Sequence, residues 1–408
     1  MCAATDLSSS QRTADVVVVG GGLIGLATAW RAARAGLSVT VVAEPVEGSA
    51  STVAAGMLTP ATEASFGEEA LMRFAVLSRD RYPSFVAELE EDSGLAAGYR
   101  AEGTLQVAFD SDDMARLGHL GELRERLGLS TERLTGRECR RLEPMLAPSV
   151  RGGYLASDDH SVDPRALLEA MRAAAERRGA VGVRDRVRRL VLDGGGRARG
   201  VVLDSGNEVS AGQVVLAAGV ATPAIAGIPE GVVPPLRPVK GQLLRLRTPG
   251  GEDPIVARTV RGLVKGSPVY LVPRGSGEVV LGATQEEQGF DTRLTAGGLW
   301  QVLRDAHELV PGVSELEVAE TCVGLRPGSP DNEPLLGPTA VPGLHLAAGH
   351  FRHGVLLAPA TGDAMAEALT TGALPDYARR FAAVRAAGGP PATADGGRTE
   401  GGEQDQWM

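Results

Sequence analysis

Arg326 lies in the segment ETCVGLRPGSPDNEPLLG, residues 320–337, which contains too much glycine and proline for a helix or a central strand. A guanidinium is always charged, and its planar fork of donors matches a carboxylate or a phosphate. A surface salt bridge is the commoner role for a single arginine. Arg326 is therefore a candidate anion-binding residue, and the other motifs of the chain decide between these two roles.

Three glycines form the pattern G-x-G-x-x-G between an apolar run at residues 14–20 and a predicted helix at residues 23–35. Gly20 makes a tight turn, Gly22 lets backbone amides approach a pyrophosphate, and Gly25 allows the helix to pack closely on the strand. The N-terminus of the helix attracts negative charge. The pattern predicts a bound dinucleotide.

A second predicted strand, LSVTVVAE, ends at Glu44 and completes a strand, turn, helix, strand unit. An acidic residue at this position accepts hydrogen bonds from ribose hydroxyls and disfavours a 2′-phosphate. The alternative is an acid that only caps a loop.

The composition limits the possible partners. The chain has 408 residues, 43% of them hydrophobic, which predicts two or three domains with real cores. A formal charge of -10 argues against nucleic acid and anionic membranes as partners. Three distant cysteines offer no disulfide framework, and neither a signal peptide nor an 18-residue apolar run is present. We expect a cytoplasmic protein that binds small molecules.

The chain also contains regions of different character. Residues 66–150 read as helical and charged, whereas short strands after residue 180 predict an antiparallel meander. Residues 236–318 read as strands with a helix, and a late buried strand precedes a helix at about 355–370. The ends, 1–13 and 387–408, are low in apolar residues and predict disordered tails.

Four further motifs accompany the glycine pattern: STVAAGMLTP (51–60), VYLVPR (269–274), GLRPGSPDNEPLLG (324–337) and GHFRHGVLLAPATG (349–362). Together they resemble the D-amino-acid oxidase and sarcosine oxidase superfamily, and most closely the glycine oxidases of thiamine biosynthesis. The resemblance covers about residues 14–385. An NAD-dependent enzyme is disfavoured, because the last of these motifs has no role there.

The resemblance implies an α/β fold, with an FAD-binding Rossmann-type (glutathione-reductase-like) domain and a second, mixed-sheet substrate domain. The two domains use discontiguous segments: 14–85, 158–225 and 318–386 for FAD, and 86–157 and 226–317 for the substrate.

The resemblance also implies which residues contact FAD. They are Gly20, Gly22, Leu23, Ile24, Gly25, Glu44, Ser51, Thr52, Ala55, Gly56, Met57, Val187, Gly219, His350, Phe351, His353, Gly354, Val355 and Leu356. Read alone, Val187 is an ordinary core valine. His350 and His353 could instead form a metal pair, but no further ligand cluster accompanies them, so we expect no metal.

For catalysis, the resemblance places Arg326 and the Tyr270 hydroxyl on the substrate carboxylate and Arg352 near the substrate. Such anchoring would fix the α-carbon hydrogen toward the flavin. The alternative for Tyr270 is a core tyrosine with a satisfied hydroxyl. The helix after residue 355 would direct its dipole at the flavin.

Two residues depart from the glycine oxidase pattern. Pro268 stands where the best-known members have a histidine, which leaves the substrate size open. Cys322 stands in the segment where sarcosine oxidases attach flavin covalently. A buried, inert cysteine is the commoner outcome, so we expect non-covalent FAD, with a covalent bond at Cys322 as the alternative.

The expected reaction is the oxidation of glycine to iminoglycine and glyoxylate, with ammonia and hydrogen peroxide as products. The alternatives are a sarcosine or small D-amino-acid oxidase and a flavin-binding protein without turnover. The expected partners are an amino-acid substrate and dioxygen, and a thiazole synthase could receive the product. Relatives suggest a homotetramer.

Overall fold

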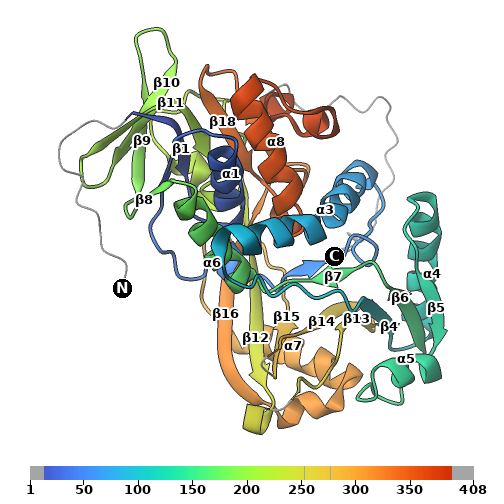
Figure 1. Cartoon of the computed structure of the whole chain (residues 1–408). Helices are drawn as coiled ribbons and strands as arrows, with labels where there is room; N and C mark the ends of the chain where they lie inside the picture. The colour runs from blue at the N-terminus through green and yellow to red at the C-terminus, as the bar shows by residue number, and fades with distance from the viewer. Residues whose placement is uncertain (1–12, 252, 276, 388–408) are drawn as a thin grey trace.

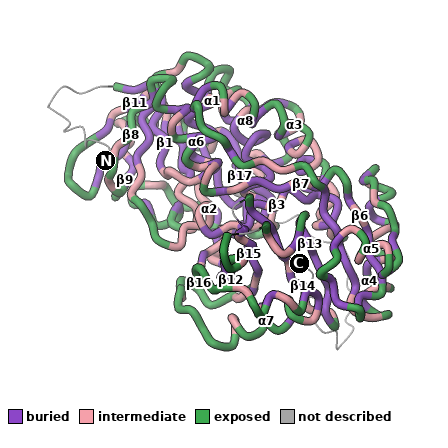
Figure 2. Tube along the Cα trace, turned by 60° about the horizontal axis from the view of Figure 1, so that its bottom comes forward, coloured by how far each residue is buried: buried purple, intermediate pink, exposed green. Residues whose placement is uncertain are grey.

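The computed structural model describes residues 13–251, 253–275 and 277–387. Apart from residues 13 and 387, both predicted tails lie outside this range. The described chain forms two large sheets, one in the upper half and one in the lower half of Figure 1. A small sheet of β3 (Met57–Leu58) and β7 (His160–Ser161) lies between them, as Figure 2 also shows.

The first sheet has the strand order β17-β18-β11-β1-β2-β8, with β9 and β10 attached to β11. The pairs β18-β11, β11-β1, β1-β2 and β2-β8 are parallel. Its strands are β1 (Ala14–Val19), β2 (Val39–Val42), β8 (Val181–Val183), β9 (Val187–Leu192), β10 (Ala198–Leu203), β11 (Glu208–Leu216), β17 (Leu335–Pro338) and β18 (Leu344–Ala348).

Each face of this sheet is covered by a different layer. One face packs against the helices α1 (Leu23–Arg34), α3 (Glu69–Ser93), α6 (Pro164–Arg177) and α8 (Ala358–Thr371). The other face packs against β9 and β10, which form the predicted antiparallel meander with β11. Because both faces are covered, β1 and β2 are continuous apolar runs.

The second sheet has the order β16-β12-β15-β14-β13-β4-β6-β5. Its strands are β4 (Thr104–Ala108), β5 (Glu132–Thr135), β6 (Gly152–Ala156), β12 (Arg237–Arg247), β13 (Thr259–Val264), β14 (Ser267–Pro273), β15 (Glu278–Gly282) and β16 (Glu317–Gly328). The helices α4 (Ser111–Arg126), α5 (Gly136–Leu142) and α7 (Ala296–Leu309) accompany it. The mixed α/β architecture confirms the predicted fold class.

Two sequence expectations differ from this arrangement. The region 66–150 is not only helical, because β4, β5 and β6 interrupt its helices and pair within the second sheet. The expected FAD-binding segment 318–386 begins inside β16, which pairs along its length with β12 of the second sheet. Proline and glycine are tolerated in β16 because it is an edge strand.

The remaining elements are short. They are α2 (Ala50–Val53) and the 3-10 helices η1 (Gly219–Ala224), η2 (Pro249–Gly251), η3 (Pro311–Glu315), η4 (Phe351–His353), η5 (Asp376–Phe381) and η6 (Ala383–Ala387). Among the helices of the described ranges, none has both the length and the apolar composition of a membrane span.

Candidate active site

The turn after β1 can be made only with glycine at two positions. Gly20 has φ +117°, and a Cβ there would lie 2.3 Å from the Ala217 carbonyl oxygen. A Cβ on Gly25 would lie 2.0 Å from the Gly20 carbonyl oxygen. The turn and the first turn of α1 therefore pack backbone against backbone, as the sequence predicted.

The N-terminus of α1 is left available for an anion. Gly22 occupies the N-cap position and has no side chain to cap the helix, and the first turn has no acidic residue. The Leu23 amide donates to Ser51 Oγ at 3.0 Å, which holds the segment after residue 50 beside the turn. A Cβ on Gly22 would lie 2.9 Å from that oxygen. This turn of small residues at the N-terminus of a helix without an acidic first turn fits the phosphates of a dinucleotide.

Glu44 follows β2, and its Oε1 accepts a hydrogen bond of 2.6 Å from Arg186 Nε. Because the Arg186 side chain is 65% exposed, this ion pair is weak and leaves Glu44 able to bind ribose hydroxyls. Val187 is the first residue of β9, and its side chain packs in the core, while the predicted backbone contact to adenine stays a prediction. Gly219 begins η1 with φ +58° and open space around its Cα.

The motif at residues 51–57 runs between the two sheets. Ser49 Oγ accepts from the Thr52 amide and begins α2. Arg274, directly after β14, donates to the Ala55 carbonyl oxygen at 2.5 Å, and Met57 lies in β3. At Gly56, a Cβ would lie 2.0 Å from the Val162 carbonyl oxygen. Contacts with Arg274 and with the backbone at Val162 thus fix this segment of small residues, which would let a planar ring lie close to it.

The loop before α8 is fixed by α3. Tyr82 donates its hydroxyl to the Val355 carbonyl oxygen at 2.6 Å, and Ser78 donates to the Leu356 carbonyl oxygen at 2.7 Å. The residues from Phe351 to His353 form η4, and Gly354 follows as its C-cap. The long helix α8 begins at Ala358, three residues later than the sequence predicted, because η4 and a turn precede it.

The two histidines of this loop have separate partners. Burial lowers the pKa of His350 to about 3, and its Nε2 lies 3.1 Å from Thr361 Oγ1. His353 Nε2 accepts from Arg352 Nε at 3.0 Å. Arginine has no acceptor, so a neutral His353 carries its proton on Nδ1. Within the described ranges, no group of three or more histidine, cysteine or acidic side chains could hold a metal.

Arg326 projects from β16 toward β12 and Tyr270. Its Nη1 donates to the carbonyl oxygens of Thr284 at 3.2 Å and Lys240 at 3.4 Å, which orients the guanidinium. It forms no ion pair with a carboxylate of the described residues. Burial lowers the pKa of Arg326, while the neighbouring Tyr270 and the carboxylate of Glu63 oppose this change. Burial raises the pKa of Tyr270, so its hydroxyl keeps its proton.

Two strand glycines make room for these side chains. A Cβ on Gly241 would lie 2.7 Å from Arg326 Nη2, and a Cβ on Gly282 would lie 2.4 Å from the Tyr270 hydroxyl. Glycine inside a strand often marks such a close approach, so this signal was present in the sequence and was missed.

Arg352 is not open to an anion in the way that Arg326 is. Its Nη2 lies 2.7 Å from Glu68 Oε2, and the two side chains are 11% and 19% exposed. Its position near the substrate stays a prediction, but its charge is already matched by an acid that the sequence reasoning did not identify.

A second ion pair was also missed. Glu63 Oε1 lies 2.7 Å from Arg261 Nη1, and the pair is as buried as the first, with side chains 10% and 11% exposed. The other carboxylate oxygen of Glu63 lies 3.3 Å from His353 Nδ1. Burial alone would raise the pKa of Glu63, but Arg261, His353 and Arg352 together hold it well below its usual range. Glu63 and Arg261 are 198 residues apart, so no local pattern links them.

Cys322 and Pro268 are the two residues that depart from the glycine oxidase pattern, and the structure places them in a buried and a half-buried position. Cys322 is 5% exposed and packs with Val53 and Ala55. Burial raises the pKa of its thiol, which disfavours the reactive thiolate. Pro268 lies in β14, opposite Leu263, and is half-buried.

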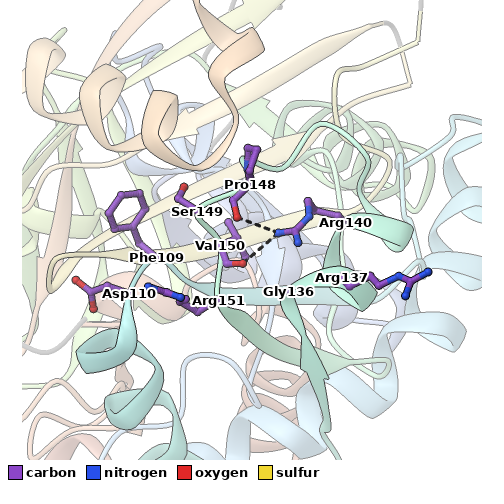
Figure 3. Close-up of a pocket in the computed structure, with 9 residues that line it drawn as sticks. All are labelled: Phe109, Asp110, Gly136, Arg137, Arg140, Pro148, Ser149, Val150 and Arg151. Atoms are coloured by element: carbon purple, nitrogen blue, oxygen red, sulfur yellow. Dashed lines mark hydrogen bonds between the residues drawn. The ribbon is translucent and has the colours of Figure 1, made fainter.

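A separate hollow lies at the far end of the second sheet (Figure 3). It has a volume of about 530 Å³ and includes Asp110, Arg137 and Arg151. Arg140 donates to the carbonyl oxygens of Pro148 and Val150 and so closes the loop at its rim. None of the predicted site residues lines this hollow.

The family model described as "FAD dependent oxidoreductase" (DAO) matches residues 15–368. The "Bifunctional protein ThiO/ThiG" of Trichormus variabilis is 33% identical over 357 residues, which are 87% of this chain and 52% of that protein. The chain thus spans about half the length of that relative.

Two solved structures are similar over nearly the whole of both chains. Glycine oxidase from Geobacillus kaustophilus is 31% identical with a TM-score of 0.82, and the match covers 91% of this chain and 99% of that one. Iminodiacetate oxidase from Chelativorans sp. is 27% identical with a TM-score of 0.81, and the match covers 90% and 98%.

Proposed function

This chain belongs to the DAO family of FAD-dependent oxidoreductases, and we propose that it oxidises glycine to iminoglycine with dioxygen as the electron acceptor. Loss of two hydrogens from glycine gives iminoglycine, and dioxygen takes up both as hydrogen peroxide. Water then hydrolyses the imine to glyoxylate and ammonia. The similarity to a glycine oxidase over nearly its whole length supports this substrate.

The glycine turn, the uncapped end of α1, Glu44 and the segment at residues 51–57 would hold FAD. When bound, this cofactor supplies the redox chemistry, because it accepts a hydride and can be reoxidised by dioxygen. We propose that it is held without a covalent bond, because Cys322 is buried and its thiol is hard to ionise.

One observation carries the proposal for the substrate: Arg326 is a half-buried guanidinium without a carboxylate partner among the described residues. A buried charge without a partner is costly, so such a residue is kept where a ligand supplies the opposite charge. Tyr270, which keeps its proton, stands beside it as a second donor. This pair suits one carboxylate.

The remaining residues position the anchor. The carbonyl oxygens of Lys240 and Thr284 fix one nitrogen of Arg326, so its other donors point in a defined direction. A carboxylate held there by two or three hydrogen bonds loses most of its rotational freedom, which brings the α-carbon of the amino acid into one orientation.

A secondary amine such as sarcosine is the second candidate. Pro268 removes a polar group that glycine oxidases of the resemblance place in the pocket, and one structural relative is an iminodiacetate oxidase, whose substrate is also a secondary amine. The anchor at Arg326 would serve both substrates equally.

The test is to purify the chain, record its flavin spectrum and add glycine, sarcosine, D-alanine or L-proline without oxygen. Loss of the 450 nm band with glycine, at a higher rate than with the other three, supports the proposal. A faster loss with sarcosine would favour the second candidate. A flavin that none of the four reduces would contradict the proposal and favour a flavin-binding protein without turnover.

Three finer points are also part of the proposal. The name of the ThiO/ThiG relative supports a hand-off of the product to a thiazole synthase, which a coupled assay with that partner would detect. A homotetramer is expected by resemblance and can be checked by light scattering. The cytoplasmic location stays a prediction from the sequence.

A further inference from the structure

The charge cluster, which we define as Glu63, Glu68, Arg261, Arg326 and Arg352, contains more guanidiniums than one carboxylate needs. Arg261 and Arg352 are matched by Glu63 and Glu68, each at 2.7 Å. Within this cluster, only Arg326 is left without an acidic partner. The cluster therefore presents one net positive charge to a ligand, because three cations face two anions.

Arg261 lies close to the place where the ligand would bind. It is the cross-strand neighbour of Tyr270 in the pairing of β13 with β14, so their side chains begin about 5 Å apart. Tyr270 in turn neighbours Arg326. A small ligand held by Arg326 and Tyr270 would thus have Arg261 within reach of a second charged group.

We propose that Glu63 sets the substrate class of this site, because by neutralising Arg261 it excludes amines that carry a second carboxylate. The inference rests on the proposed function, since it takes Arg326 as the anchor of the first carboxylate. With Glu63 ionised, a second carboxylate meets a paired guanidinium and a nearby negative charge. Without that charge, the same carboxylate meets an open guanidinium.

The test uses two ethers that imitate amine substrates but cannot be oxidised as amines. Methoxyacetate carries one carboxylate and diglycolate carries two, on otherwise matched frames. Their dissociation constants with the FAD-loaded protein are measured by calorimetry for the wild type and Glu63→Gln. We expect the ratio of the dissociation constant for diglycolate to that for methoxyacetate to fall by about tenfold or more in Glu63→Gln. An unchanged ratio would overturn the inference.

Two matched variants test whether the change in ether preference depends on the pair of Glu63 and Arg261. Glu278→Gln removes a partner from the buried pair between Glu278 and Arg245, at 2.7 Å with side chains 15% and 3% exposed, and should leave the ratio unchanged. Arg245 lies on β12 six residues from Val239, the cross-strand neighbour of Arg326. The double variant Glu63→Gln with Arg261→Gln should restore the wild-type preference. A shift that persists in the double variant would exclude Arg261 as the receiving cation.

Arg261→Gln alone provides a second route if Glu63→Gln does not fold. It leaves the Glu63 charge without Arg261, so the affinity for diglycolate should fall by about tenfold more than the affinity for methoxyacetate. Equal weakening of both ethers would contradict the inference. If Glu63→Gln weakens glycine but leaves the ether ratio unchanged, Glu63 acts on the amine, and the inference is wrong.

Failure of the proposed function gives a different pattern. If Arg326→Ala binds methoxyacetate as tightly as the wild type, Arg326 is not the anchor, whatever Glu63 does. If Arg326→Ala no longer binds either ether while Glu63→Gln keeps the wild-type ratio of the two dissociation constants, Arg326 is the anchor and the inference about Glu63 fails.

Discussion

The two halves of the site are built by different means. The cradle at β1 and α1 uses backbone amides and closely packed glycines, and a side-chain methyl at Gly25 would strike the backbone at 2.0 Å. The charged half of the site uses side chains that are balanced in pairs, Glu63 with Arg261 and Glu68 with Arg352. The first half depends on shape and the second on the count of charges.

This difference teaches where each half is vulnerable. A backbone cradle cannot relax when an atom is added, because main-chain atoms are fixed by the sheet and the helix. A balanced charge cluster tolerates changes of shape better than changes of charge, because an uncompensated buried ion is expensive.

Gly25→Val should weaken FAD binding strongly and lower turnover with it. The added side chain overlaps the Gly20 carbonyl oxygen, and overpacking of about 3 kcal/mol would weaken binding by about 100-fold. The measurement is the ratio of absorbance at 450 nm to that at 280 nm after purification. Gly297→Ala, in the first turn of α7 with open space around it, is the control. Full flavin content in Gly25→Val would show that the cradle is not needed.

Arg326→Ala should keep FAD but lower kcat/KM for glycine by about 100-fold. Two hydrogen bonds to a charged group, at about 1.5 kcal/mol each, account for this loss. Peroxide production at several glycine concentrations gives the value, and the visible spectrum reports retained flavin. Unchanged kinetics would remove Arg326 from the pocket and return it to a structural role.

The backbone half could be predicted from the sequence because its pieces are close in the chain. The structure begins α1 at Leu23, as predicted, and ends it at Arg34, one residue before the predicted end. The turn between β1 and α1 follows from the spacing of Gly20 and Gly25. Local spacing and hydrophobic periodicity carried this information.

The charged half could be predicted only in part. Arg326 and Tyr270 were found through motifs of the resemblance, and the structure does bring them together. The partners that decide the charge were not found, because Glu68 and Arg352 are 284 residues apart. Such a pairing depends on how the start of α3 packs against η4, and neither periodicity nor composition records that.

His345→Gln tests whether the first sheet excludes charge as strongly as its packing indicates. His345 in β18 is 4% exposed, with Nε2 on Gln213 at 2.8 Å and no hydrogen-bond partner for Nδ1. Burial, with help from Arg197, lowers its pKa to about 4. The unfolded chain binds a proton below about pH 6.5 and the folded chain only below about pH 4, so stability is lost as the pH falls through this window.

Between pH 7 and pH 5, the wild type should therefore lose about 2 kcal/mol more unfolding free energy than His345→Gln. Denaturant titrations at both pH values measure the difference, in which the other titrating groups cancel. His119→Gln, on an exposed part of α4, should follow the wild type. If the wild type and His345→Gln lose equal unfolding free energy, protonation of His345 does not destabilise the folded sheet.

Gly241→Ala should have the smallest effect of these variants. It changes the shape of the charged half of the site without changing its charge, and so tests whether shape also matters there. The new Cβ would lie 2.7 Å from Arg326 Nη2, which is too close for any contact, so the guanidinium must shift. The carbonyl oxygens of Lys240 and Thr284 that orient it would then be poorly aligned. We expect kcat/KM for glycine to fall by about tenfold, equivalent to about 1.4 kcal/mol.

If a charge cluster tolerates changes of shape, Gly241→Ala should also keep its preference for methoxyacetate over diglycolate, although it binds both more weakly. Gly182→Ala in β8, which adds the same methyl to the first sheet at ordinary contact distance, is the matched control and should change neither value. A change in the preference between the two ethers would contradict the division. It would mean that the position of Arg326, and not only the number of charges, decides which ligand the pocket accepts.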